Sequence, residues 1–587
     1  MIQLPSLKNL VSGIQQVVLR FPMVILVAAI NLATVIVLIE LPNAVKTIVW
    51  AVPLLLTCLL AIPLFISTHL ATKRQQWSTP IKIAALAGVL ALLVLYYFSI
   101  GFELIQSDYY RFGMFFVCAH LLVSFAPFVG YYETNGFWHF NKTLLVQLFS
   151  ATLYAGTLFV GIIIAVETVR FLFGSFTQTL VGSLEMYIFF IIFLFLHPLF
   201  FLYGIPERLD TFEAQTTYPR GVKVFTQYVL LPLVVVYLLI LYVYSGKILV
   251  QWQLPEGGVA YLVMAFSVAG VLALLLVHPL RESTEERWIR LFTNRFYLAL
   301  FPLILLLFIA IYRRIHDYGI TENRYLVAAL AIWLAGISVY FLVGKREDIR
   351  WIPISLFAFS LLMAVGPWSI FSVSRRDQLQ RFSALLLEYK LLDASGTIAG
   401  NGIVSQEDFD QLISGVRFFR DRREMSFLCP FFSTLPPNDN DFALAQSMEK
   451  RIQQVVQKEG VSVTAADETL SFYLSASENE LSVDIGGFDV LSTVDIYGDQ
   501  IFEYDNWEIK STQDGAQLTV VKGANEVATW DISARLIQLH DQYGTSSYEV
   551  DPVSLTFDAP NARLVLTNIS KSGTTFSYKG FLLRKNK

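Results

Sequence analysis

The chain has 587 residues, 55% of them hydrophobic, and its mean hydropathy is +0.55. This excess of apolar residues is typical of a membrane protein and argues against an ordinary soluble one. Residues 1–373 hold 23 Lys and Arg against 17 Asp and Glu, whereas residues 374–587 hold 20 against 30. A net-negative C-terminal part has no electrostatic reason to bind nucleic acid. The three cysteines lie too far apart in the sequence for a disulfide framework or a zinc site.

Apolar stretches of membrane-spanning length recur from Phe21 to Trp368. A hydrocarbon core about 30 Å thick needs about 20 helical residues, and its lack of water favours helices as the spanning structure. The pattern therefore predicts an all-α transmembrane bundle of about 11 helices. The first stretch is too long for a signal peptide and has no cleavage site after it, so we expect it to remain as a span. The expected spans are residues 21–40, 47–70, 81–101, 113–131, 144–166, 186–204, 225–245, 258–280, 296–313, 325–344 and 352–372.

Two segments between or before these spans are predicted to lie on the membrane surface as amphipathic helices. Residues 1–20 place Leu7, Leu10 and Ile14 on one helical face, with Ser6 as a plausible N-cap. Residues 281–295 combine many charges with an apolar stripe. Helices of this kind anchor and orient a bundle, and some dock a partner.

The loops between the spans predict how the chain is oriented. With the N-terminus in the cytoplasm, 16 Lys and Arg lie on the cytoplasmic side and seven on the opposite side. The positive-inside rule favours this orientation, and an odd number of spans then places the C-terminal region outside. For a bacterium, the expected location is the inner membrane, with a cytoplasmic N-terminus and a periplasmic C-terminal domain.

The domain plan follows from these patterns. We expect a cytoplasmic amphipathic helix at 1–20, a transmembrane bundle at 21–373, a helical connector at 374–465 and a β-rich extracytoplasmic domain at 466–587. In the connector, Ser405 and Asp408 predict the capping box of one helix, and a further helix is expected from Phe442 to Glu459, stopped by Gly460.

After residue 465 the apolar period changes to that of strands. A hairpin is expected where the last two strands meet at SKSG, and an amphipathic helix is expected from Ile532 to Tyr543. Either a sandwich or a sheet with a covering helix suits the pattern. The expected strands are LSFYLSA, ELSVDIGG, WEIKS, AQLTVVKG, VSLTFDA, ARLVLTN and TFSYKGFLL.

The densest polar cluster outside the soluble region is RRIHDYGITENR, residues 313–324, on the predicted external side. Opposite charges at this density can lock a loop against the bundle, or they can bind an anionic lipid head group. In the structural case we expect Glu322 and Arg324 to form a coupled pair. The candidate ligand-binding residues are Arg313, Arg314, His316, Asp317, Tyr318, Glu322 and Arg324.

Polar residues within the predicted spans are few, and they are functional candidates because burying them in lipid is costly. His197-Pro198 and His278-Pro279 recur at span ends, where proline is expected to stop the helix and imidazole to reach the interface. An ion site or an internal duplication is the alternative. The sequence contains no Walker, HExxH, GxSxG or CxxC motif, and no catalytic residue, metal site or cofactor is predicted. The other candidates are Asn31, His69 and His120.

Several stretches resemble a bacterial multi-pass membrane family named for domain of unknown function 4153. They are HPLFFLYGIPERLD (197–210), YVLLPLVVVYLLILYVYSGKILV (228–250), YGITENRY (318–325) and GPWSIFSVSRRDQLQR (366–381). The similarity covers the membrane part and runs into the external region. It implies membership of the family, but it brings no activity or functional residue with it.

Three functions compete at this point. The first is a non-enzymatic envelope protein whose bundle anchors a periplasmic domain that binds a protein, glycan or lipid. The second is a transporter, since prolines within spans can mark broken helices; the third is a glycosyl- or lipid-transferase, which would need an external carboxylate. The prolines are Pro53, Pro63, Pro127, Pro232 and Pro302, and the carboxylates are Glu40, Glu103 and Asp108. The expected partners are the bilayer, an anionic lipid head group and an envelope protein.

Overall fold

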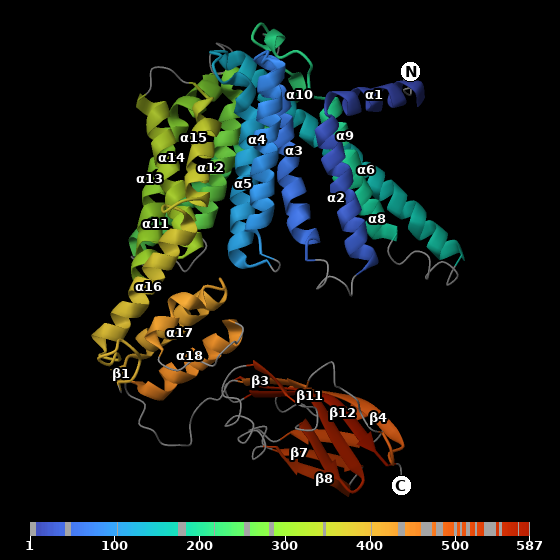
Figure 1. Ribbon diagram of the computed structural model, residues 1–587, viewed down its shortest axis with the longest axis vertical. Coiled ribbons are helices and arrows are strands. Elements are labelled where there is room, and N and C mark those ends of the chain that lie inside the picture. The colour runs from blue at the N-terminus through green and yellow to red at the C-terminus, as the bar shows by residue number, and fades with distance from the viewer. Residues whose placement is uncertain are drawn as a thin grey trace. The chain divides into compact units, whose positions relative to one another are not determined.

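The computed structural model divides the chain into two compact units, Met1–Val456 and Gln457–Lys587. Each unit is described by itself (Figure 1). The structure describes all residues except 1–6, 42–48, 102–103, 174–183, 216–217, 252–258, 281–286, 344–347, 401, 433–440, 459–471, 477–484, 498–501, 505–506, 512–516, 523–524, 533–546, 551–554, 573–574 and 586–587.

The first unit contains the predicted helical bundle. Ten helical stretches among the described residues are long and apolar enough to cross a membrane, so the chain is a multi-pass membrane protein. The helices of the bundle are α1 (Leu7–Arg20), α2 (Pro22–Glu40), α3 (Ala51–Arg74), α4 (Thr79–Ser99), α5 (Gln106–Phe125), α6 (Thr134–Phe173), α8 (Leu184–Phe190), α9 (His197–Tyr203), α10 (Arg220–Phe225), α11 (Leu231–Gln251), α12 (Val259–Val277), α13 (Arg287–Tyr318), α14 (Glu322–Val343) and α15 (Trp351–Ala364).

The eleventh predicted span is a shorter apolar helix. α15 has 14 residues and is about 21 Å long at about 1.5 Å per residue, which is less than the thickness of a hydrocarbon core. Figure 1 shows α1 and the connector helix α16 (Ile370–Glu388) at opposite ends of the bundle. Among the described residues, α15 is thus a shorter apolar helix in addition to the ten long stretches.

The bundle has two hydrophobic cores. One is formed mainly by α1 to α6 and α9, with Phe21, Phe65 and Phe140 among its buried members. The other is formed by α11 to α15, with Leu231, Leu300 and Leu307 fully buried. Helices α5 and α15 pack closely together, which joins the two halves.

The structure corrects two expectations about helix ends. From Arg287 onward, the segment predicted as a separate surface helix is the beginning of α13, which continues without a break to Tyr318; residues 281–286 lie outside the described residues. Pro198 also does not end its helix, because α9 continues to Tyr203 after a π-helical segment at 191–196. A second π-helical segment, 226–230, precedes Pro232. A proline removes a backbone donor, and a wider local turn accommodates that loss.

The connector consists of three helices with a shared core. They are α16, α17 (Gln406–Arg420) and α18 (Asp441–Val455), with strand β1 (Gly402–Val404) before α17 and strand β2 (Val456–Lys458) after α18. The capping prediction is confirmed, because the Ser405 side chain accepts a hydrogen bond from the Asp408 N–H. The predicted end of the last helix is wrong: it stops at Val455, where the backbone becomes extended.

The second unit is a β-sandwich, one of the two alternatives left open by the sequence. One sheet has the order β4-β12-β11-β3-β9, with β10 also paired to β11, and the other has the order β5-β6-β7-β8. The strands are β3 (Phe472–Ala476), β4 (Val490–Tyr497), β5 (Phe502–Tyr504), β6 (Trp507–Ser511), β7 (Gln517–Lys522), β8 (Asn525–Asp531), β9 (Ser547–Val550), β10 (Thr556–Ala559), β11 (Ala562–Ser572) and β12 (Thr575–Arg584). Residues of both sheets, including Ile509, Leu518, Leu564 and Tyr578, share one core.

The predicted final hairpin is confirmed, since β11 and β12 pair antiparallel from Ala562↔Arg584 to Ser572↔Thr575. A bulge after Leu566 explains the glycine opposite it, because a Cβ at Gly580 would lie 2.1 Å from the Val565 carbonyl oxygen. The helix predicted at 532–543 lies outside the described residues apart from its first residue, as does most of ELSVDIGG. The boundary at 456 falls before the predicted 465, and the four-part domain plan stays a prediction.

Candidate functional site

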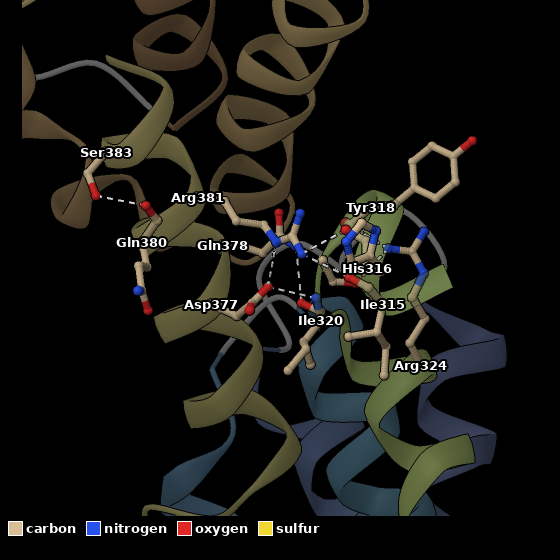
Figure 2. A network of polar contacts seen from close by, with 11 residues as sticks. Ile315, His316, Tyr318, Ile320, Arg324, Asp377, Gln378, Gln380, Arg381 and Ser383 are labelled. Atoms are coloured by element: carbon tan, nitrogen blue, oxygen red, sulfur yellow. Dashed lines mark hydrogen bonds and ion pairs between the residues drawn. The ribbon is translucent and has the colours of Figure 1, made fainter. Parts of the chain in front are cut away.

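The polar cluster at 313–324 forms the end of α13, a tight turn and the start of α14. Figure 2 shows this turn facing α16, the helix that leads into the connector. Because both elements belong to the first compact unit, their contacts can be described directly. We refer to residues 315–322, together with Arg422 and the side chains of α16 that contact them, as the junction.

Three side chains of α16 bind the backbone of the turn. Asp377 accepts a hydrogen bond from the Ile320 N–H at 2.7 Å, and Gln378 donates to the Ile320 carbonyl at 3.1 Å. Arg381 donates to the carbonyls of Ile315 at 2.9 Å and His316 at 3.1 Å. The last carbonyls of a helix lack partners within that helix, so Arg381 satisfies the His316 carbonyl and adds a second donor to the Ile315 carbonyl.

Gly319 is required by this close approach. Its φ is +74°, in the left-handed region that favours glycine, and its N–H closes the helix on the Ile315 carbonyl at 2.9 Å. A Cβ at this position would lie 2.6 Å from Nε of Arg381 and 2.7 Å from the amide nitrogen of Gln378. The turn and α16 therefore fit only with a residue that lacks a side chain.

A buried ion pair lies next to the turn. Glu322, at the start of α14, accepts two hydrogen bonds of 2.5 Å from the guanidinium of Arg422, which follows α17. The Glu322 and Arg422 side chains are only 4% and 11% exposed. Arg422 also stacks on the Phe418 ring at 3.6 Å and donates to the Phe418 carbonyl at 2.8 Å. This pair joins the bundle to the connector across 100 residues of sequence.

The predicted pairing of Glu322 with Arg324 is therefore wrong. Arg324 instead donates to the carbonyls of Tyr318 and Gly319, both at 2.9 Å, and lies over the Tyr318 ring. Glu322 and Arg324 are two residues apart at the start of a helix, so their side chains point in different directions. One turns toward the connector, and the other caps the end of α13.

The remaining candidate residues form the outer side of the same segment. The side chains of Arg313 and His316 are 59% and 72% exposed, and both lie near Asp317, at 3.7 Å and 3.2 Å. The Tyr318 ring points away from α16 in Figure 2. Arg314 adds a further positive charge, because it acts electrostatically on Arg324. A ligand could reach this side without disturbing the junction.

Helix α16 connects the two cores that flank the junction. Its first residue, Ile370, is fully buried against Met114, Ala329 and Met363 of the bundle. Ser369 caps this end by accepting a hydrogen bond from the Ser372 N–H at 3.2 Å. Later in the helix, buried Phe382 and Leu386 belong to the connector core. One uninterrupted helix is thus held by apolar packing at both ends and by polar contacts in the middle.

The partners of the cluster lie outside the segment that the sequence marks as polar. Asp377 and Arg381 lie in GPWSIFSVSRRDQLQR, one of the stretches that carry the family resemblance. Their spacing of four residues on a helix, with an ion pair of 3.3 Å, was a usable signal. Arg422 had none, because its contact with Glu322 depends on the path of the intervening chain.

The polar residues predicted within spans differ in their surroundings. His69 packs against Phe21, with ring centroids 4.6 Å apart, and His197 lies 3.1 Å from the Thr152 hydroxyl. Asn31 is fully buried. Where the chain is described, no group of three or more His, Cys, Asp or Glu is placed to hold a metal ion.

The carboxylates considered for a transferase are engaged. Glu40 accepts a hydrogen bond from the Tyr187 hydroxyl. Asp108 is buried, accepts from the Ile105 N–H at 3.1 Å and lies 3.6 Å from Arg111. Glu103 lies outside the described residues.

Comparison with known proteins places the chain in a family without an assigned activity. The family model described as "Domain of unknown function (DUF4153)" matches residues 26–394, which include the bundle, the turn at Gly319 and α16. A relative from Pasteurella multocida (strain Pm70), "Uncharacterized protein PM1469", is 23% identical over 457 residues, covering 75% of this chain and 73% of its own length. No solved structure is significantly similar to the chain.

Proposed function

Since the chain belongs to the membrane family defined by domain of unknown function DUF4153, we propose that it is an integral inner-membrane protein whose bundle anchors and presents a periplasmic interaction domain. The observation that carries this proposal is the junction. A multi-pass bundle fixes one continuous helix, α16, and a buried Glu322–Arg422 pair holds the connector that follows. Binding partners of the C-terminal domain would be envelope proteins, glycans or lipids.

A fixed connector suits a presenting function because it limits where the next domain can go. A flexible linker would let that domain sample a wide volume, whereas a docked helix sets the point from which it starts. The buried pair supports the same reading. Two desolvated charges contribute little net stability compared with apolar residues, but they specify one docking geometry, since any other would leave a charge unpaired.

The orientation of the bundle is supported by the distribution of charge. The predicted cytoplasmic segments hold 16 basic residues and the opposite ones seven, and α1 lies at the end of the bundle opposite to α16. Alkaline phosphatase fused after Lys587 is expected to be active, and green fluorescent protein at the same place is expected to be dark. Fusions after Gln76, at the other end of the bundle, are the matched control and should give the reverse pair. An inactive phosphatase and a bright fluorescent protein at Lys587 would refute the periplasmic placement.

The two alternative functions lose part of their motivating signals. Helices α3 and α13 continue through Pro63 and Pro302, so these prolines do not mark the broken helices of a transporter. Glu40 and Asp108 each have a structural partner in the described residues, which favours a structural role for them over a transferase role. Anchoring and presentation of the C-terminal domain is therefore the function that we propose.

A further inference from the structure

A cavity of about 380 Å³ lies within the bundle, between its two hydrophobic cores. Phe137, Trp138 and Ile349 line one side and belong to the first core, whereas Val271 and Leu334 line the other and belong to the second. Ligand sites occur preferentially between packed units, and this volume is within their usual range of about 300–1,000 Å³. The walls are almost entirely apolar, which suits a hydrocarbon chain.

The cavity is accessible from the side of the bundle. Val268 and Leu272 of α12 line it and are 54% and 48% exposed. Both lie in the middle part of a membrane-spanning stretch, Ala260–Leu280, so the medium they face is the bilayer. A lipid of the surrounding membrane is therefore the molecule with direct access to this opening.

One charged group lines the cavity. Lys142 of α6 is half-buried, and no carboxylate among the described residues forms an ion pair with it. Its ammonium lies 5.7 Å from the centre of the Trp138 ring, and that ring is fixed by a hydrogen bond of 2.6 Å from the indole N–H to the Leu275 carbonyl. The side-chain amide of the neighbouring Asn141 donates hydrogen bonds to the carbonyls of Ser124 and Phe137. A positive charge is thus held at an apolar cavity without a negative partner from the described protein.

We propose that this cavity binds one acyl chain of an anionic phospholipid, with the phosphate paired to Lys142. Lys142 is eight residues after the start of α6, or about 12 Å along the helix axis at about 1.5 Å per residue. A long lysine side chain reaches from such a depth to the level of the head groups. The lipid belongs to the leaflet at the α1 end of the bundle, and its chain extends from there toward Met264 and Leu330, which lie five and eight residues after the starts of α12 and α14.

The test uses the full-length protein in nanodiscs that contain phosphatidylglycerol and phosphatidylcholine. Native mass spectrometry after stepwise delipidation is expected to show one phosphatidylglycerol retained by the wild type. Lys142→Met, which keeps the length of the side chain, is expected to lower the retained fraction by about tenfold, and Leu272→Trp at the opening is expected to lower it as well. Lys247→Met is the matched control, because Lys247 lies in spanning helix α11 and does not line the cavity.

A second measurement locates the lipid chain without relying on affinity. Phosphatidylglycerol with brominated chains is expected to quench Trp138 and Trp333, which both line the cavity, and the quenched fraction is expected to fall in Trp333→Phe and in Lys142→Met. The proposal would be overturned if Lys142→Met retained as much phosphatidylglycerol as the wild type does, or if the wild type retained phosphatidylcholine equally well. Unchanged retention of phosphatidylglycerol in Leu272→Trp would overturn it too, because the lipid would then be bound elsewhere.

Discussion

The inner and outer sides of the segment 313–324 are built from the same dozen residues and differ in almost every physical respect. On the inner side, Glu322 is 4% exposed and paired, and the backbone of Ile320 is bonded to α16. On the outer side, Arg313 and His316 are largely exposed and share one carboxylate at 3.2 Å or more. One run of charges in a sequence can therefore bind the connector on one side and form an exposed surface on the other.

The largest effect is expected from breaking the buried pair on the inner side. Glu322→Gln keeps the shape of the side chain but leaves Arg422 with an unpaired charge in a buried position shielded from solvent. Removing one partner of a buried ion pair costs about 3–5 kcal/mol. The melting temperature of the connector, measured with the protein in nanodiscs, should therefore fall clearly. The measurement is thermal unfolding followed by intrinsic fluorescence.

A matched control comes from the connector itself. Glu424 pairs with Arg375 at 2.8 Å, but these side chains are 25% and 33% exposed, and an exposed pair contributes only about 0–1 kcal/mol. Glu424→Gln should therefore shift melting little. The double variant Glu322→Arg with Arg422→Glu is expected to recover part of the loss. Equal changes in melting temperature for Glu322→Gln and Glu424→Gln would show that the Glu322–Arg422 pair does not hold the connector against the bundle.

A smaller effect is expected at the turn. Gly319→Ala places a Cβ against Arg381 and Gln378 in addition to forcing a left-handed residue, which alone costs about 1–2 kcal/mol. Gly130→Ala is the control, because Gly130 has a φ of +84° and no atom near its missing Cβ. The expected result is a loss of stability larger in Gly319→Ala than in Gly130→Ala. The same loss in both would mean that α16 does not press on the turn.

The smallest effect on stability is expected on the outer side. Arg313→Ala removes an exposed charge with one partner at 3.7 Å, so the melting temperature should stay nearly unchanged. If this side binds an anionic head group, Arg313→Ala and Arg314→Ala should lower the amount of copurifying anionic lipid, measured by mass spectrometry. Unchanged lipid content in both variants would exclude these two arginines as a ligand site. Arg324→Ala is unsuitable for this purpose because it also removes two helix-capping hydrogen bonds.

The sequence was informative where structure depends on neighbouring residues. Apolar length predicted the bundle, the Ser405–Asp408 spacing predicted the start of α17, and strand periodicity predicted the final hairpin. It was less informative where structure depends on contacts far along the chain. The Glu322–Arg422 pair is one example, and the choice of a sandwich over a covered sheet is another. The strands β4, β5, β8 and β9 were not predicted, and the structure places each of them by its pairing with a neighbouring strand.

The central claim is that the bundle holds the connector in one fixed position, and a distance between spin labels tests it most directly. Labels at Tyr109→Cys on α5 and Leu387→Cys on α16 occupy exposed positions, in a Cys429→Ser background where the remaining cysteines are buried. The account predicts one narrow distance distribution by pulsed electron resonance in nanodiscs, preserved in Gly130→Ala and broadened in Glu322→Gln. A broad distribution in the otherwise unaltered protein, or an equally narrow one in Glu322→Gln, would contradict it.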